Sequence, residues 1–172
     1  MTYKEQLHNA REFAIKKHHG QKYGIYPYEI HLGNVVSILL RFSVLPNNQT
    51  NTNLLASAWL HDILEDTNVS IEELENKFGK TIVKIVFSLT DGNGADRREK
   101  KENMYNKLVN NQDGIIVKLA DRIANVEFCL IHNNTKLYEM YKIEQSQMEE
   151  KILPKINTKI AYSLLKYLQT LI

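Results

Sequence analysis

The chain has 172 residues, of which 43% are hydrophobic and 24% are charged, a composition typical of a globular protein with one sizeable core. Its 22 lysines and arginines nearly balance 20 acids, so the net charge of +2 argues against a polybasic surface for nucleic acid. Cys129 is the single cysteine, which excludes an intramolecular disulfide, and no apolar run reaches the roughly 18 residues of a membrane span. The first six residues lack the apolar core of a signal peptide. We therefore expect one cytoplasmic domain over residues 1–172 that binds neither nucleic acid nor membranes.

Apolar residues recur mostly three and four positions apart. The chain has only three prolines and seven glycines, too few turn residues to separate many short strands. These patterns predict an all-α bundle. We expect Thr52 to cap the third helix, and Ser70 and Glu73 to form a capping box before the fourth. The expected helices lie at about 3–19, 29–42, 53–64, 71–79, 80–89, from 97 onward, 114–126, 136–150 and 154–170.

Two loops carry groups that suit a nucleotide. The loop at 20–28 contains Lys22 and three tyrosines, Tyr23 among them, a combination that can hold a phosphate and stack on a base. Tyrosines packed on the domain surface are the alternative interpretation. After the loop at 90–96, four cations within five residues form a candidate phosphate clamp, for which a solvated helix face is the alternative. These cations are Arg97, Arg98, Lys100 and Lys101.

Four candidate metal ligands lie near the ends of, or inside, different apolar helices. His61 and Asp62 follow an apolar run, His31 lies one turn inside the second helix, and Asp121 interrupts an apolar stretch where a buried carboxylate needs a partner. Each alone has an ordinary interpretation as a capping, surface or packing residue. Together, two imidazoles and two carboxylates suit manganese, iron or zinc and leave positions for water and a substrate oxygen.

Four motifs stand in one order within about residues 5–145: His19-Gly20-Gln21, Pro27-Tyr28 with His31 three residues on, His61-Asp62-x-x-Glu65-Asp66-Thr67, and Lys118-Leu119-Ala120-Asp121-Arg122-x-x-Asn125. They resemble the motifs of HD-domain hydrolases of the RelA/SpoT type, particularly the stand-alone small alarmone hydrolases. The resemblance implies a compact helical bundle that binds one metal, usually manganese. It also implies hydrolysis of the 3′-pyrophosphate of guanosine tetra- or pentaphosphate, (p)ppGpp, to GDP or GTP within the stringent response. A synthetase domain has no room in 172 residues.

The resemblance also assigns roles to individual residues. Glu65 and Asp66 would position and deprotonate the attacking water, with either one as the base. Asn125 would help hold the nucleoside or its ribose, and Arg97 or Arg98 would meet phosphate. Apart from the resemblance, Lys22, Tyr23 and Tyr141 are expected to border the substrate. The metal ligands would be His31, His61, Asp62 and Asp121.

Two departures from the family pattern bear on the substrate. The family typically continues from His-Gly-Gln into an Arg-Lys pair that touches the purine, whereas this chain reads Gln21-Lys22-Tyr23-Gly24, so Tyr23 and Gly24 occupy that region. Leu32 follows His31 where proline is typical. Hydrolysis is therefore better supported than guanine preference. The alternatives are another nucleotide, such as an adenosine 3′-pyrophosphate, a 5′-nucleotide or NADPH, and a non-catalytic nucleotide-sensing module. The sequence leaves open the native metal and a homodimer.

Overall fold

The computed structural model describes residues 2–172, and helices account for most of them. The all-α expectation is confirmed. The helices are α1 (Tyr3–Lys17), α2 (Glu29–Arg41), α3 (Gln49–Leu60), α4 (Ile63–Asp66), α5 (Ile71–Phe78), α6 (Lys80–Leu89), α7 (Arg97–Leu108), α8 (Gln112–Ile131), α9 (Thr135–Ile152), the 3₁₀ helix η1 (Leu153–Lys155) and α10 (Lys159–Leu171).

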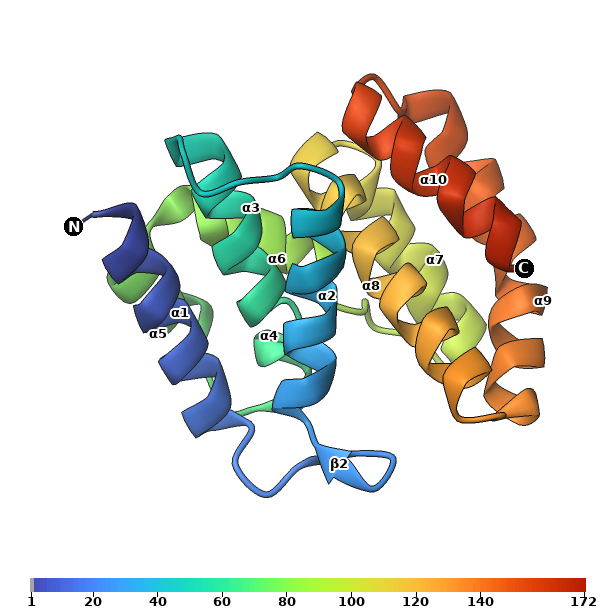
Figure 1. The fold of residues 1–172 in the computed structure, drawn as a ribbon, viewed down its shortest axis with the longest axis horizontal. Helices are drawn as coiled ribbons and strands as arrows, with labels where there is room; N and C mark the ends of the chain where they lie inside the picture. The colour runs from blue at the N-terminus through green and yellow to red at the C-terminus, as the bar shows by residue number, and fades with distance from the viewer. Residues whose placement is uncertain (1) are drawn as a thin grey trace.

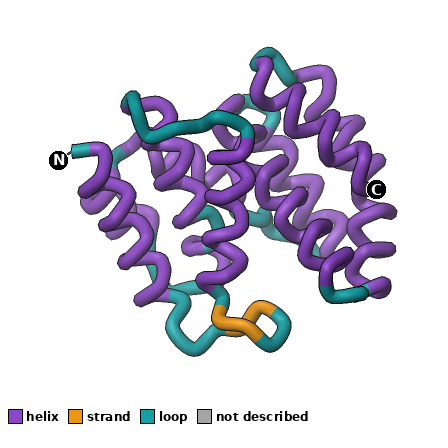
Figure 2. The backbone as a smooth tube through the Cα atoms, viewed as in Figure 1, coloured by secondary structure: helices purple, strands orange, loops and turns teal. Residues whose placement is uncertain are grey.

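The loop expected after α1 contains a small β-hairpin. Strands β1 (Lys22–Tyr23) and β2 (Tyr26–Pro27) pair antiparallel, with Tyr23 opposite Tyr26. Gly24 has a φ of 61° and allows the two-residue turn between them. Such short strands carry no alternation in the sequence, so the pattern gave no sign of them. The hairpin lies at one end of the bundle, beside the start of α2 (Figure 2).

Helix α8 is the central helix, and α2, α3, α6, α7, α9 and α10 all pack against it. Figure 1 shows α2, α3, α6 and α8 in the middle, with α1 and α5 on one side and α9 and α10 on the other. A helix enclosed in this way is apolar on most of its circumference. The fully or nearly buried apolar residues of α8 are Ile115, Ile116, Val117, Leu119, Ala120, Ile123, Ala124, Val126, Phe128 and Cys129.

Several element boundaries differ from the expected ones: α8 extends to Ile131 instead of residue 126, and local capping explains the start of α3 and of α10. Helix α3 begins at Gln49 because the Asn48 side chain accepts a hydrogen bond from the backbone N–H of Asn51 at 2.9 Å. Thr52 is therefore inside the helix, and its hydroxyl donates to the Asn48 carbonyl at 2.7 Å. At the other end, α3 stops at Leu60, and Glu65 and Asp66 belong to the one-turn helix α4 instead of a turn.

The last expected helix is also divided. Pro154 lies in η1, and α10 begins only at Lys159, where the Thr158 hydroxyl accepts from the N–H of Ala161 at 3.2 Å. The expected capping box before α5 is half formed. Ser70 accepts from the N–H of Glu73 at 3.0 Å, while the Glu73 carboxylate pairs with Lys17 of α1 at 2.8 Å. The ion pair with Lys17 thus takes the place of the hydrogen bond that the Glu73 carboxylate would make to the Ser70 backbone N–H in a capping box.

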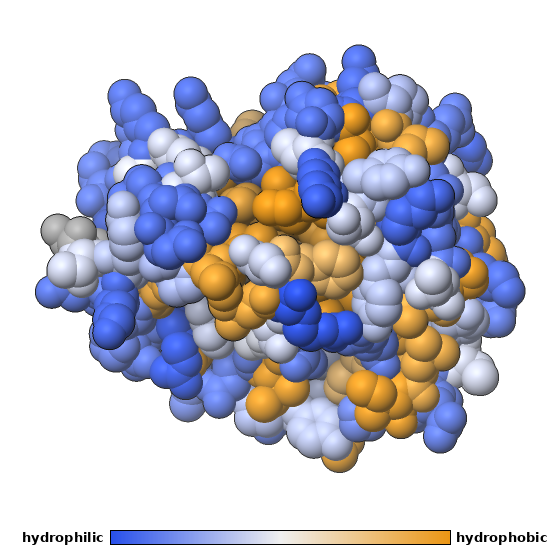
Figure 3. Space-filling model, turned by 45° about the horizontal axis from the view of Figure 1, so that its top comes forward, coloured by the Kyte–Doolittle hydropathy of each residue, from blue (hydrophilic) through white to orange (hydrophobic). Residues whose placement is uncertain are grey.

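The surface is predominantly polar at its edges, and apolar side chains gather toward the middle of the face shown in Figure 3. None of the helices within residues 2–172 has the length and apolar character that a membrane crossing requires.

The enclosure of α8 predicts how two leucines of one helix differ. Leu119 is 0% exposed, so Leu119→Ala should lower the free energy of unfolding by about 2–5 kcal/mol through lost burial and a cavity. Leu130, near the end of the same helix, is 46% exposed, and Leu130→Ala should cost less than about 1 kcal/mol. Urea unfolding of both variants measures the difference. Equal losses would contradict the central position of α8.

Candidate metal centre

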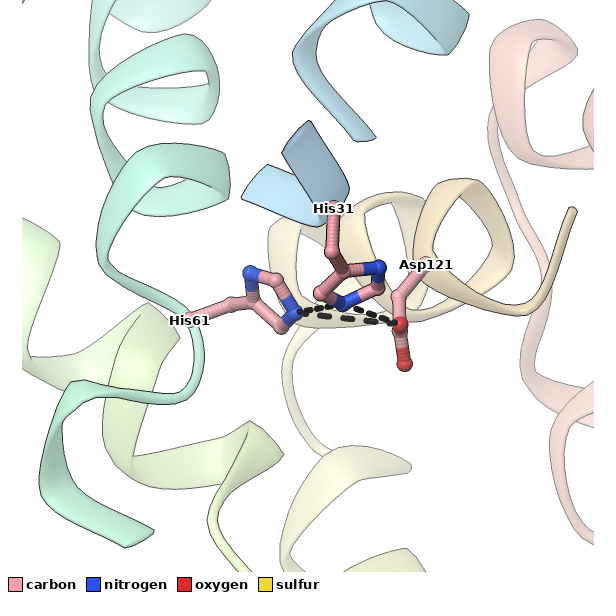
Figure 4. A group of neighbouring side chains, drawn as sticks. All are labelled: His31, His61 and Asp121. Atoms are coloured by element: carbon pink, nitrogen blue, oxygen red, sulfur yellow. Dashed lines mark hydrogen bonds and ion pairs between the residues drawn. The ribbon is translucent and has the colours of Figure 1, made fainter. Parts of the chain in front are cut away.

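Two histidines and an aspartate from three separate helices meet in the interior. His31 lies in the first turn of α2, His61 directly follows α3, and Asp121 lies in the middle of α8. One ligand atom of each lies within 4.8 Å of the others, and all three side chains are buried (Figure 4). The helices that meet around α8 thus bring together three of the four residues singled out as metal ligands.

The spacing of these atoms fits a divalent cation. Nε2 of His31 lies 3.2 Å from Nε2 of His61 and 3.4 Å from Oδ1 of Asp121, and the distance from His61 Nε2 to the same oxygen is 3.7 Å. Ligands bound at about 2.1 Å around one cation are about 3.0–3.4 Å apart. The carboxylate of Asp62 adjoins this group, with Oδ2 at 2.9 Å from Nε2 of His61 and 3.5 Å from Nε2 of His31.

The electrostatics of the cluster favour a positive charge at this point. Burial alone would lower the pKa of His61, but Asp62 and a hydrogen bond with Asp121 raise it well above 6.5, and the pKa of His31 is raised by the same two acids. Burial would raise the pKa of Asp62, yet His61 and His31 hold it well below its usual range. A divalent cation would supply the charge that these two carboxylates stabilise.

Neighbouring groups fix how the cluster is oriented. Nδ1 of His61 lies 2.8 Å from the Ala58 carbonyl, which places the ring proton there and leaves Nε2 free to act as a ligand. The outer oxygen of Asp121, Oδ2, accepts from Nζ of Lys118 at 2.8 Å, and Oδ1 accepts from the amide of Asn125 at 2.6 Å. Although burial would raise the pKa of Asp121, Lys118 and the two histidines hold it well below 3.8.

The cluster opens into a cavity of about 230 Å³ that contains acids and cations. Such a mixture suits a substrate that carries phosphates and meets a metal. The acids lining the cavity are Asp62, Glu65, Asp66 and Asp121, the cations are Arg97, Lys101, Lys118 and Arg122, and the remaining residues are Tyr23, Tyr28, His31, His61, Leu89, Asn125 and Tyr141.

Glu65 and Asp66 reach the cavity from α4. Oε2 of Glu65 accepts from the backbone N–H of Asp91 at 3.1 Å, and Oδ2 of Asp66 accepts from the side chain of Gln21 at 2.8 Å. Desolvation in the cavity raises the pKa of Glu65 above 4.5. A carboxyl with a raised pKa beside a metal-binding cluster is suited to proton transfer.

The cavity separates the residues proposed to meet substrate into two groups. Tyr23, Arg97, Asn125 and Tyr141 line it, whereas Lys22 and Arg98 are exposed outside its lining within residues 2–172. Adjacent residues of a strand face opposite sides, so Tyr23 and Lys22 cannot both face the cavity. Adjacent residues of a helix point about 100° apart, which separates Arg97 from Arg98 in the same way.

Lys101 was expected only as one of the four cations of the phosphate clamp, and the sequence assigned no site role to Lys118, Arg122 or Tyr28. Lys101 follows Arg97 by four residues, which places both on one face of α7. This spacing was a usable signal that the second cation would be Lys101 instead of Arg98. The phenol of Tyr28 donates to Oδ2 of Asp62 at 2.5 Å, a contact that nothing in the sequence indicates.

Residues 10–151 match the family described as HD domain. The chain belongs to this family. The resemblance to HD-domain proteins of the RelA/SpoT type is also confirmed by relatives at the sequence level. The HD domain is 33% identical over 144 residues to guanosine-3′,5′-bis(diphosphate) 3′-pyrophosphohydrolase of Aquifex aeolicus, in a match that covers 80% of this chain and 20% of that protein.

Two animal proteins are similar over more of their own length. The HD domain is 32% identical over 126 residues to guanosine-3′,5′-bis(diphosphate) 3′-pyrophosphohydrolase MESH1 of Homo sapiens, covering 70% of this chain and 68% of that protein. For MESH1 of Danio rerio the identity is 32% over 119 residues, covering 66% of this chain and 63% of the relative. The chain thus spans a fifth of the Aquifex protein and just under two thirds of the Danio protein.

A solved structure shares the fold. It belongs to a metazoan ortholog of SpoT that is described as hydrolysing ppGpp and acting in starvation responses. The TM-score is 0.75, at 21% sequence identity, over 96% of this chain and 94% of the other. The likeness confirms a helical HD-domain fold.

Glu144 of α9 joins the cavity rim to the core. Its carboxylate accepts from Nη2 of the buried Arg122 at 2.9 Å and from Nε of Arg97 at 2.6 Å. Burial would raise the pKa of Glu144, but hydrogen bonding with Arg97 and the charge of Arg122 hold it below 4.5.

The lowered pKa of Glu144 predicts a pH-dependent contribution to stability. The contribution is complete above the unfolded-state value of about 4.5 and is lost as the pH falls through the lower folded-state value. Glu144→Gln should therefore reduce the free energy of unfolding by about 1–3 kcal/mol at pH 7, with a smaller difference below about pH 4.5. Urea unfolding across this pH range measures it. Glu139→Gln, an exposed position of α9, is the control, and a Glu144→Gln effect independent of pH would contradict the ionic interpretation.

Proposed function

We propose that this chain is a divalent-metal-dependent pyrophosphohydrolase that removes the 3′-pyrophosphate from guanosine 3′,5′-bis(diphosphate). The observation that carries the proposal is the convergence of His31, His61 and Asp121 with Asp62 at the base of a cavity lined by four cations. The names of the relatives supply the substrate. We further propose that residues 1–172 act as one hydrolase domain.

His31, His61, Asp62 and Asp121 would hold the metal, and we propose manganese because imidazole and carboxylate ligands together suit it. When bound, such an ion supplies a Lewis acid for a phosphate oxygen and lowers the pKa of water. Lys118 and Asn125 hold the Asp121 carboxylate so that Oδ1 faces the histidines. The side chains of the centre are thereby oriented before a metal binds.

Glu65 and Asp66 are the candidates for the base. In the proposed reaction the water oxygen forms a bond to the phosphorus on ribose O3′, the bond from that phosphorus to O3′ breaks, and O3′ takes up a proton. One of the two carboxylates accepts the proton that water loses. We favour Glu65, because desolvation in the cavity raises its pKa and makes it the stronger proton acceptor once ionised.

The cations of the cavity would neutralise the polyphosphate. Lys118 and Arg122 of α8 and Arg97 and Lys101 of α7 line the same cavity as the metal cluster. Donors fixed before the substrate arrives stabilise developing charge without reorganisation. The proposal includes a cytoplasmic location and a part in the stringent response, while a homodimer stays a prediction.

The deciding experiment measures hydrolysis of a nucleotide panel by purified, metal-stripped protein with added MnCl2. The panel contains guanosine 3′,5′-bis(diphosphate), its adenosine analogue, GTP and NADPH, with products identified by chromatography. We expect GDP and pyrophosphate from the first compound, and Asp62→Ala should lose bound manganese and turnover together.

Selective hydrolysis of another panel member would assign a different substrate to the same site. A different base is a real alternative because Tyr23 occupies the region where the family has a cation that touches the purine. The phenol of Tyr23 donates a hydrogen bond to Asn125 at 2.7 Å. No turnover of any panel member by manganese-loaded protein would overturn the proposed hydrolase.

A pair of isosteric variants tests which carboxylate is the base. Glu65→Gln should keep manganese binding and KM while lowering kcat on the order of a hundredfold, since only the proton acceptor is lost. Asp66→Asn should have the smaller effect on kcat. Steady-state kinetics with metal analysis of each variant distinguishes them, and the reverse order would assign the role to Asp66.

A further inference from the structure

The hairpin segment between α1 and α2 contributes hydroxyl groups to the metal cluster from outside it. Tyr28 and Tyr23 both line the cavity; the phenol of Tyr28 donates to the Asp62 carboxylate, and that of Tyr23 donates to the side-chain amide oxygen of Asn125. Neither hydroxyl takes part in the proposed reaction. Their geometry therefore needs its own explanation.

Tyr28 acts on Asp62 directly. Its phenol donates to Oδ2 at 2.5 Å, the same oxygen that lies 2.9 Å from Nε2 of His61. The ring is held on both sides, because it stacks on His18 at 4.8 Å between ring centroids and meets the edge of His31 at 5.4 Å. Tyr28 also immediately precedes α2, so its position is fixed relative to His31 by the helix.

Tyr23 acts on Asp121 through an amide. Its phenol donates to Oδ1 of Asn125 at 2.7 Å, and Nδ2 of Asn125 donates to Oδ1 of Asp121 at 2.6 Å. The Tyr23 ring packs on Phe128 of α8 at 4.2 Å and on His31 at 4.7 Å. Tyr23 thus orients the Asn125 side chain from one side. On the other side, Nδ2 of Asn125 donates to Asp121 twice, to the carboxylate and, at 3.0 Å, to the backbone carbonyl.

We propose that Tyr28 and Tyr23 are positioning residues of the metal centre: Tyr28 orients the Asp62 carboxylate directly, and Tyr23 orients the Asp121 carboxylate through Asn125. The inference rests on the proposed function in requiring that the cluster binds a divalent metal. It changes the expectation for Tyr23 and Asn125, which the loop composition and the resemblance, respectively, assigned to the substrate. Outer partners that hold metal-binding carboxylates typically contribute ten- to hundredfold to metal affinity.

The hydroxyl groups, rather than the rings, carry this role. Replacing tyrosine by phenylalanine keeps the stacking on His18, Phe128 and His31 and removes only the donated proton. Tyr26 offers a matched control, since it lies on the same hairpin and its hydroxyl makes no hydrogen bond within the described part of the chain, residues 2–172. Tyr26→Phe therefore deletes the same group with no carboxylate at its end.

The test is calorimetric titration of metal-stripped protein with MnCl2 alone, in the absence of nucleotide. Tyr28→Phe and Tyr23→Phe should each raise the Kd for manganese about tenfold or more, and the double variant should bind more weakly than either. Tyr26→Phe should stay within about twofold of the unchanged protein. Circular dichroism of each metal-free variant checks that the fold is kept.

A second readout does not depend on the size of the affinity change. Electron paramagnetic resonance of manganese at saturating concentration should give an altered spectrum for Tyr28→Phe, because the Asp62 carboxylate turns, and an unaltered one for Tyr26→Phe. This measurement remains decisive if a variant is less stable than expected.

Three other outcomes would overturn the inference in distinguishable ways. Kd values and spectra like those of Tyr26→Phe would remove the positioning role and leave the proposed function intact. A raised KM for nucleotide in Tyr23→Phe with unchanged manganese affinity would make Tyr23 a substrate contact. Failure of the unchanged protein to bind manganese would overturn the proposed metal site itself.

Discussion

The structure depends on one buried charge, the carboxylate of Asp121 in the middle of the most enclosed helix. A carboxylate surrounded by apolar residues is strongly destabilising unless other groups satisfy both of its oxygens. Here Lys118 and Asn125 come from the same helix, and His31 and His61 come from two others. The helices α2, α3 and α8 must therefore pack in one arrangement for the charge to be tolerated. The helix packing that satisfies the Asp121 carboxylate is also the packing that assembles the candidate metal centre.

The sequence predicted the helical fold and the meeting of the candidate ligands for a physical reason. Each of His31, His61 and Asp121 interrupts or ends an apolar helix, so burying the apolar faces brings these polar residues to the interior. Positions of elements were less well predicted where a local bond decides them. Asn48 starts α3 four residues before the expected start at residue 53, and Thr158 delays α10, because single side-chain caps outweigh the apolar pattern.

The contacts around the cavity were harder to predict than its ligands. Tyr28 and Asp62 are 34 residues apart and Tyr23 and Asn125 are 102 apart, so no local spacing relates them. The choice between Arg98 and Lys101 was different, because helix periodicity alone separates them. Glu144 shows the limit most clearly: its two arginine partners lie on α7 and α8, and only the packing of α9 reveals the pair. Long-range polar contacts depend on packing details that the periodicity of one segment does not contain.

The distribution of the cluster along the chain has a consequence for how the protein becomes functional during synthesis. The two histidines are made early, but Asp121 follows 60 residues after His61, and α8 is covered in turn by α10 near the end of the chain. A growing chain therefore contains His31, His61 and the adjoining Asp62 before it contains Asp121, and the cluster is incomplete until α8 has emerged and packed. Assembly of the candidate metal centre is thereby tied to the packing of α8 against α2 and α3, because the first half of the chain supplies the two imidazoles and Asp62 but not Asp121.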